Sequence, residues 1–298
     1  MKRVVSISLG SSHRDHAVEV DLLGERIRIE RIGTDGDMIR AQQMYRELDG
    51  KVDAFGVGGT DLSLRLDDRV YPLYSVLKLV EGVSKTPYVD GGGLRYILER
   101  KVMQYVEAEI GNEISPKTAL ITSAADRFDM ARSFDEAGYD AVYGDLMFAL
   151  GLPIPIRGIK NLKRIASVLL PVFGRMPFSM LYPTGEKQRK NEPKFVKYYQ
   201  QASVVAGDFN YIYRHMPARL DGKVVVTNTT TAGDVETLRK AGVRYLATAT
   251  PRLEGRTFGT NVMEASLVAL AGKGRPLTSA EIQEMLTKLD FHPTVQKL

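Results

Sequence analysis

From residue 118 onward, apolar extended stretches alternate with helical stretches, and this alternation constrains the fold more than any other feature. The run 223–227 is a β-branched strand, and the turn after it leads into a helix that ends at Gly242. Such alternation is typical of a doubly wound α/β domain with a parallel, Rossmann-like sheet. We therefore predict strands at 118–123, 140–144, 179–183, 203–207, 223–227 and 245–250, and helices at 126–137, 159–170, 193–201, 209–216 and 232–241.

The stretch before residue 115 predicts a smaller, mixed α/β domain. Turn formers at 111–116 mark its end, so the predicted domains are residues 1–115, which we expect to bind substrate, and 116–298. Thr278 and Glu281 start a last helix, which we expect to pack back onto the first domain. The expected elements of the first domain are a strand at 4–9, a hairpin of 17–23 and 26–32, a helix at 37–48, strands at 53–59 and 86–90, and a helix that ends near 110.

Composition excludes several classes of protein. The chain is 44% hydrophobic and 26% charged over 298 residues, which is ordinary for a globular protein and rules out a disordered or fibrous one. It has no Cys, and its four His are scattered without ligand spacing, so we expect neither disulfides nor a metal site. Because no membrane-spanning apolar run and no leader sequence occur, we expect a cytoplasmic protein without a membrane partner.

The net charge of +5 would suit a nucleic-acid partner only if the basic residues were concentrated. The basic residues are densest at 187–197, but Glu186 and Glu192 break the basic run, and it lacks the interleaved aromatics of a stacking platform. We therefore predict no nucleic-acid partner.

Two polar turns, after the strands 223–227 and 245–250, carry more functional groups than folding requires. In a parallel sheet, the turns that leave the carboxyl ends of strands line the ligand crevice. Two arginines near a helix N-terminus favour an anionic, hydroxylated ligand such as a cofactor. Asn261 and Glu264 are also expected to cap a helix at 262–271. The residues assigned to cofactor binding here are Asn228, Thr229, Thr230, Arg252, Arg256 and Asn261.

The turn after the strand 118–123 stands where a dinucleotide fold places its phosphate-binding glycines. The glycines are missing, but Ser123 and two alanines are small enough to let a phosphate approach the helix N-terminus. Asp126 and Arg127 are the further candidate cofactor residues, with Asp140 or Asp145 near the place of a ribose-binding acid. The alternative is a tight strand-to-helix turn with a charged cap.

Asp90 ends a buried strand and is followed by three glycines and Arg95. Consecutive glycines let backbone N–H groups face outward, and they are costly in conformational entropy, so this motif favours an anion or polyol site over a simple flexible turn. Asp208 follows another strand in the same way and is a candidate general base. We predict Asp90 and Asp208 as catalytic residues, and the substrate-binding residues are Ser11, Ser12, Arg14, Asp61 and Arg95.

Three stretches resemble a known group of proteins: SLGSS at 8–12, VAGDF at 205–209 and TPRLEGRTFGTN at 250–261. They are similar to bacterial proteins that carry the name quinate 5-dehydrogenase, and the order of the two domains and the returning helix resembles shikimate and quinate dehydrogenases. The resemblance implies a two-domain fold that oxidises a hydroxylated carboxylate with NAD or NADP. The family's Gly-x-Gly-Gly phosphate loop is replaced here by SAAD at 123–126.

Two functions stay open from the sequence. The first is an NAD(P)-linked oxidoreductase acting on a small hydroxylated carboxylate such as quinate or shikimate, with NADP favoured over NAD because the net charge is positive. The second is an enzyme or binding protein for a phosphorylated or carboxylated metabolite that uses no nicotinamide. In both, we expect a small-molecule cleft between the domains, and a homodimer is left open.

Overall fold

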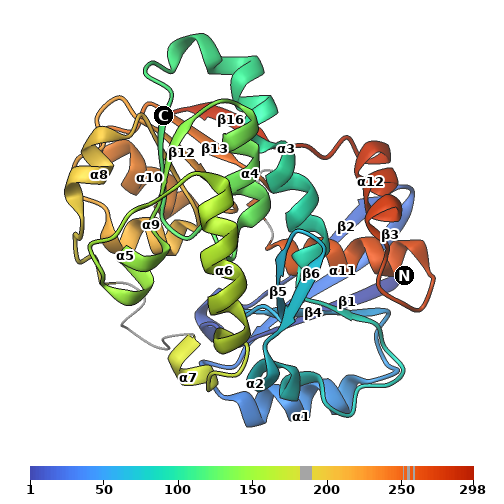
Figure 1. Cartoon of the computed structure of the whole chain (residues 1–298). Helices are drawn as coiled ribbons and strands as arrows, with labels where there is room; N and C mark the ends of the chain where they lie inside the picture. The colour runs from blue at the N-terminus through green and yellow to red at the C-terminus, as the bar shows by residue number, and fades with distance from the viewer. Residues whose placement is uncertain (182–189, 251, 254–255, 258) are drawn as a thin grey trace.

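The computed structural model describes residues 1–181, 190–250, 252–253, 256–257 and 259–298. Figure 1 shows an α/β protein with two sheets: a mixed sheet formed by the N-terminal strands and a larger, Rossmann-like sheet, with helix α3 between them. The two-sheet fold class predicted from strand and helix alternation is confirmed. Within the described residues, no helix is both long and apolar enough to cross a membrane.

The first sheet has the strand order β2-β3-β1-β4-β7. Strands β3, β1, β4 and β7 run parallel to one another, and β2 joins β3 as the antiparallel hairpin expected around Gly24. The strands of this sheet are β1 (Lys2–Ser8), β2 (His16–Leu22), β3 (Glu25–Gly33), β4 (Ala54–Gly58) and β7 (Tyr88–Val89). The sequence analysis left out a small separate hairpin, β5 (Ser63–Leu66) with β6 (Arg69–Pro72).

The second sheet has the order β10-β9-β8-β11-β12-β13-β16. Its five central strands are parallel, and the two edge strands, β10 and β16, are antiparallel to their neighbours. From β8 the chain first adds β9 on one side and later adds β11 on the other side of β8. The strand order therefore reverses between β8 and β11, which makes this place a topological switch point. The strands are β8 (Thr118–Ile121), β9 (Asp140–Tyr143), β10 (Ile156–Arg157), β11 (Val204–Ala206), β12 (Val224–Thr227), β13 (Tyr245–Thr248) and β16 (Thr294–Lys297).

One predicted strand is wrong. The segment expected as a strand at 179–183 begins as helix α7 (Phe178–Leu181), and residues 182–183 lie outside the described part of the chain. Pro177 directly precedes the helix, and its fixed φ angle favours a helical turn. The third strand of this sheet in chain order is instead the short strand β10, at the edge of the sheet.

The helices cover both faces of each sheet (Figure 1). The capping pairs predicted for two of them are confirmed: Thr231 with Asp234, and Thr278 with Glu281. The α-helices are α1 (Met38–Leu48), α2 (Tyr74–Leu77), α3 (Gly92–Ile110), α4 (Phe128–Glu136), α5 (Asp145–Leu150), α6 (Ile159–Phe173), α7, α8 (Val196–Gln201), α9 (Phe209–His215), α10 (Ala232–Lys240), α11 (Thr260–Ala271) and α12 (Ser279–Lys288). The short 3-10 helices are η1 (Ser12–Arg14), η2 (Lys78–Val80) and η3 (Gly111–Glu113).

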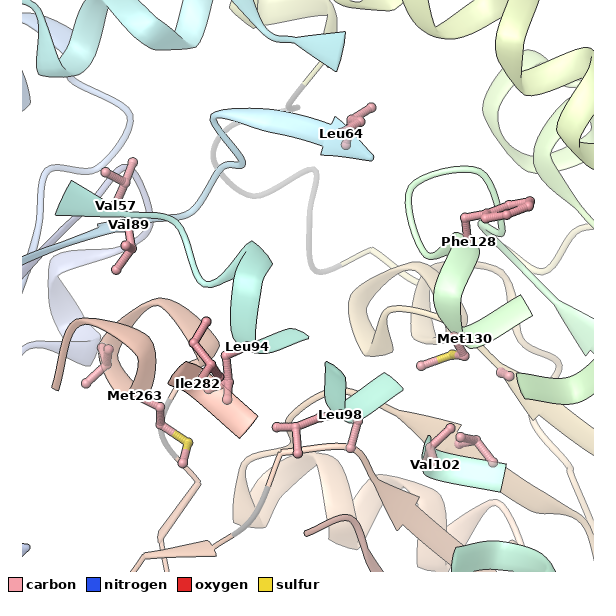
Figure 2. Close-up of a cluster of buried hydrophobic side chains, with 14 of the residues drawn as sticks. Val57, Leu64, Val89, Leu94, Leu98, Val102, Phe128, Met130, Met263 and Ile282 are labelled. Atoms are coloured by element: carbon pink, nitrogen blue, oxygen red, sulfur yellow. The ribbon is translucent and has the colours of Figure 1, made fainter. Parts of the chain in front are cut away.

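Two helices of the C-terminal part return to the first half of the chain: α12, as predicted, and α11, for which no such return was predicted. Helix α11 packs on β1 and β4, and α12 packs on α3. An almost entirely buried, apolar helix such as α11 requires partners on every side. Figure 2 shows the resulting core, in which Val57 of β4, Leu94 of α3, Phe128 of α4 and Met263 of α11 belong to one cluster. The two sheets therefore share a hydrophobic core.

The predicted cap of α11 is wrong in its detail. The helix begins at Thr260, and its N-cap is Gly259, which makes no side-chain hydrogen bond. Asn261 Nδ2 instead donates to Ser6 Oγ of β1 at 2.7 Å, and the Glu264 carboxylate accepts from the backbone N–H of Leu94 at 3.0 Å. Side chains that would cap an isolated helix are used here to join α11 to β1 and α3.

Candidate functional site

A cluster of charged and polar side chains lies where strand ends of both sheets approach helix α3. Asp61 follows β4, and Asp90 follows β7. Arg127 lies in the turn after β8, and Asp208 in the turn after β11, so the switch point of the second sheet contributes to the same cluster. The members of the charged cluster are Asp61, Asp90, Arg95, Glu99, Asp126, Arg127, Asp208 and Asn228.

On the side of the first sheet, Arg95 is the central cation. Its Nη1 donates to Asp61 Oδ1 at 2.8 Å. The Asp90 carboxylate accepts from the backbone N–H groups of Leu62 at 2.7 Å and Gly92 at 2.8 Å. Burial, together with the neighbouring Asp61 carboxylate, raises the pKa of Asp90. A carboxyl group with a raised pKa beside a buried cation is suited to exchange protons with a ligand.

On the side of the second sheet, Arg127 joins three elements. Its guanidinium donates to Glu99 of α3 and, at 2.8 Å, to Asp208 Oδ2. Asn228 Nδ2 donates to the same Asp208 oxygen at 3.1 Å, while Asp208 Oδ1 accepts from the N–H of Asn210 and caps α9. The turns of Asp90 and Asn228 thus lie on the same side of the molecule, connected through α3. Burial raises the pKa of Glu99 and of Asp126.

Several buried atoms of the charged cluster have no hydrogen-bond partner among the described residues. They include the donors Nε and Nη2 of Arg95 and Nε of Arg127. They also include the acceptors Oε2 of Glu99 and Oδ1 of Asp126. Buried polar atoms are normally satisfied, and those left open are places where a ligand or water can bind. Open donors and open acceptors occur together here.

The turn after β8, predicted to hold a cofactor phosphate, is bonded to a carboxylate of the protein. Asp145, at the start of α5, accepts from the N–H groups of Ala124 at 3.0 Å and Ala125 at 2.8 Å. Burial raises the pKa of Asp145 to about 7. Ser123 and Asp126 lie in this turn as predicted, but its N–H groups already have an acidic partner. Asp140, the other acid considered for a ribose, pairs with Arg157 at the surface.

The N-terminus of α3, which contains two of the three glycines, is likewise bonded to an internal carboxylate. Besides Leu94, Glu264 approaches Gly93, where an added Cβ would lie 2.7 Å from its Oε1. A Cβ at Gly91, whose φ is +89°, would lie 2.3 Å from the backbone nitrogen of Asn261. Burial raises the pKa of Glu264 to about 7. Close packing of α11 therefore accounts for glycines that the sequence analysis assigned to ligand binding.

The other predicted site residues are distributed over neighbouring turns. Ser11 caps the short helix η1, the N–H of Ser12 donates to Asp35 Oδ1 at 2.8 Å, and Arg14 is exposed. This turn lies beside the turn of Asp61, because an added Cβ at Gly59 would be 2.9 Å from the nitrogen of Gly10. Thr229 and Thr230 follow Asn228 before α10. Arg252 and Arg256 belong to a hairpin of β14 (Arg252–Leu253) and β15 (Arg256–Thr257), and their side chains lie outside the described part of the structure.

The sequence analysis missed two members of this region. Glu99 lies one helical turn after Arg95 on α3, so the i,i+4 spacing could have indicated it. Glu264 lies 170 residues from Leu94, and no local signal pairs them. Among the described residues, no group of His, Asp or Glu side chains is arranged to hold a metal ion.

Two family models match the chain. Residues 93–298 match a domain of unknown function (DUF8754), and residues 3–90 match another domain of unknown function (DUF8753). No curated protein matches the sequence.

Solved structures with a similar arrangement have low sequence identity. A *Mycobacterium smegmatis* protein in complex with β-D-fucofuranose is 11% identical over 98% of this chain and 99% of its own, with a TM-score of 0.38. The malic enzyme of *Entamoeba histolytica* is 10% identical, covers 95% of this chain and 61% of its own, and has a TM-score of 0.42. The NAD-dependent malic enzyme of *Thermotoga maritima* is 10% identical over 97% of this chain and 84% of its own, with a TM-score of 0.36.

Proposed function

The chain belongs to the family described as a domain of unknown function (DUF8754), and we propose that it binds a small polyhydroxylated compound at the charged cluster and performs acid–base chemistry on it. The observation that carries this proposal is the pairing of open donors on Arg95 and Arg127 with open acceptors on Glu99 and Asp126. A hydroxyl group both donates and accepts hydrogen bonds, so it matches such a mixed lining better than a group that only accepts.

The charge of the cluster supports the same ligand class. Carboxylates outnumber guanidiniums around Arg95 and Arg127, so a phosphate group would meet repulsion from Asp61, Asp126 and Asp208. A neutral polyol avoids this repulsion, and a hydroxy acid with a single carboxylate meets less of it. Quinate and shikimate, which the sequence resemblance implies, are compounds of this second kind.

Asp90 is the residue we assign to proton transfer. Burial brings the pKa of Asp90 closer to neutral pH than the pKa of an exposed carboxyl group. A general acid or base works best when its pKa lies near the working pH. The two backbone N–H groups that it accepts from fix its orientation. Asp208, held by Arg127 and Asn228, is better placed to bind a ligand hydroxyl than to move freely as a base.

A second candidate function is the NAD(P)-linked oxidoreductase. The order of the central strands and the switch point between β8 and β11 favour it, because dinucleotides bind at this point of such sheets. Asp145 weighs against it, since its carboxylate takes the N–H groups that would meet the cofactor pyrophosphate. We therefore rank NADP or NAD binding second.

Thermal unfolding with a panel of compounds tests the two functions. Quinate, shikimate, a neutral cyclitol, NAD and NADP are each added to the wild type, to Asp61→Asn and to the surface control Asp221→Asn. We expect a polyhydroxylated compound at 100 times its Kd to stabilise the wild type and the control by about 2.7 kcal/mol, and Asp61→Asn by less. Stabilisation by NAD or NADP alone would favour the second function. If no hydroxylated compound shifts the midpoint, or if Asp61→Asn responds as the control does, the proposed site is wrong.

A further inference from the structure

The β5–β6 hairpin extends from the charged cluster. It starts directly after Asp61, and the N–H of Leu62 is held by the Asp90 carboxylate. Its two strands pair only with each other, so it is a separate two-stranded sheet. Figure 1 shows it between the first sheet and helices α4 and α6. The hairpin therefore spans the space between the two halves of the molecule.

The end of the hairpin is tied to the second half by one carboxylate. Asp67, at the turn with φ +51°, pairs with Arg132 of α4 at 2.7 Å and with Lys163 of α6. The apolar anchors of the hairpin are Leu64 and Leu66, both buried. Figure 2 shows Leu64 on the hairpin and Phe128 on α4, and both belong to the same hydrophobic cluster.

The middle of the hairpin brings a cation to the charged cluster. The Arg65 guanidinium lies 4.7 Å from the ring centroid of Tyr96, and Arg95 lies 5.4 Å from the same ring. The aromatic ring thus connects the hairpin to the central cation of the site. Tyr96 is buried, and Arg65 lies over its ring.

The interior of the site is closed to solvent in this arrangement. The exposed fractions are 6% for Arg95, 0% for Glu99 and 4% for Arg127. A ligand that reaches their open atoms requires an element to move. An isolated two-stranded hairpin is only marginally stable by itself, so this one depends on the Asp67 ion pairs and on the contacts of Leu64 and Leu66 to stay in place.

We propose that the β5–β6 hairpin covers the charged cluster. The Asp67 ion pairs hold it closed, and Arg65 lies over Tyr96 in the closed site. When it opens, the Asp67 ion pairs break and the two leucines leave their contacts, which exposes the Arg95 side of the site. Its role in ligand entry rests on the proposed function, whereas the opening itself is a property of the ligand-free protein.

Hydrogen exchange of the ligand-free protein tests the opening. Asp67→Asn weakens the ion pairs that hold the hairpin, and Asp221→Asn removes an exposed, local ion pair elsewhere in the protein. In Asp67→Asn, we expect the backbone amides of residues 62–73 and those of residues 92–95, at the start of α3, to exchange at a common rate. This rate should be roughly fivefold higher than in the wild type. The control should leave both segments unchanged. Hairpin amides that exchange as slowly as those of β1 and β4, and do not respond to Asp67→Asn, would overturn the proposal.

A reversible lock tests the role in binding. The chain has no cysteine, so Asp68→Cys with Lys160→Cys, an exposed position one turn before Lys163 on α6, supplies the only two thiols and leaves the Asp67 ion pairs in place. A bis-maleimide with a disulfide in its spacer joins the hairpin to α6, and quinate is the probe. We expect the joined protein to bind quinate at least about tenfold more slowly, with recovery after reduction, and the single-cysteine proteins to be unaffected. Equal rates in joined and reduced protein would reject the cover. If the wild type binds neither quinate nor any other hydroxylated compound of the panel, the proposed function fails while hydrogen exchange still decides the cover.

Discussion

Arg127 donates to the Asp208 carboxylate at 2.8 Å, and this contact joins the turn after β8 to the turn after β11. The same guanidinium also binds Glu99 of α3. One buried cation therefore fixes the switch point of the second sheet against the helix that lies beside the first sheet. The charged cluster depends on this contact for its shape.

Removal of Arg127 should be strongly destabilising. Arg127→Met leaves Glu99, which is 0% exposed, without its counter-charge, and we expect a loss of about 3–5 kcal/mol in the free energy of unfolding at pH 7. The double variant Glu99→Gln with Arg127→Met should recover much of this loss, because no charge remains buried alone. Urea unfolding measures both. A loss below about 1 kcal/mol for the single variant would show that the pair does not hold the site together.

Glu264 should make stability fall as the pH rises. Its pKa is raised by burial from 4.5 to about 7, so between these values the folded protein holds a proton that the unfolded chain has released. Stability therefore decreases from about pH 4.5 to about pH 7 and is constant above. Glu264→Gln lacks this contribution. Between pH 5 and pH 8, the free energy of unfolding should therefore decrease by about 2–3 kcal/mol less in Glu264→Gln than in the wild type. The raised pKa of Asp145 also makes the free energy of unfolding fall with rising pH. This contribution is the same in both proteins, so it cancels in the difference between them. Parallel pH profiles would contradict the assignment.

Gly91 should tolerate alanine much less well than a glycine of similar backbone conformation. Gly91 has φ +89°, and an added Cβ would meet the backbone of Thr260 and Asn261 at 2.5 and 2.3 Å. Gly138 has φ +79° with nothing within 4 Å, so Gly138→Ala reports the backbone strain alone, about 1 kcal/mol. We expect Gly91→Ala to cost at least about 2 kcal/mol more in urea unfolding. Equal losses would mean that α11 does not pack closely on this turn.

Arg256 carries a prediction that comes from the sequence. If it grips a carboxylate of the ligand, Arg256→Ala should weaken binding by roughly 1.5–3 kcal/mol, the range for a charge-assisted hydrogen bond. Calorimetry with the tightest compound of the panel measures this, with Arg219→Ala, an exposed arginine, as the control. The thermal midpoint without ligand should stay nearly unchanged. Normal binding, or early unfolding of the empty variant, would make the arginine structural.

Local patterns in the sequence predicted much of the fold. The β-branched runs at 223–227 and 245–250 became β12 and β13, and Thr231 with Asp234 capped α10, because strand propensity and capping involve residues close in the chain. The same holds for the placement of Asp90 and Asp208 at strand ends. Parallel strands bring their carboxyl ends to one edge, so the sequence could indicate where polar turns gather.

The sequence by itself determined most of the alternation of strands and helices, apart from the segment 179–183, and it determined to within one or two residues where the other strands end. Only the tertiary structure decided which groups the charged and polar residues meet. Glu264 binds the start of α3, and Asp145 binds the turn before α4, although both segments were expected to bind a ligand. Asn261 donates to Ser6 instead of capping its own helix. These contacts join segments far apart in the chain, and their partners are set by how α5 and α11 pack, which no local pattern encodes.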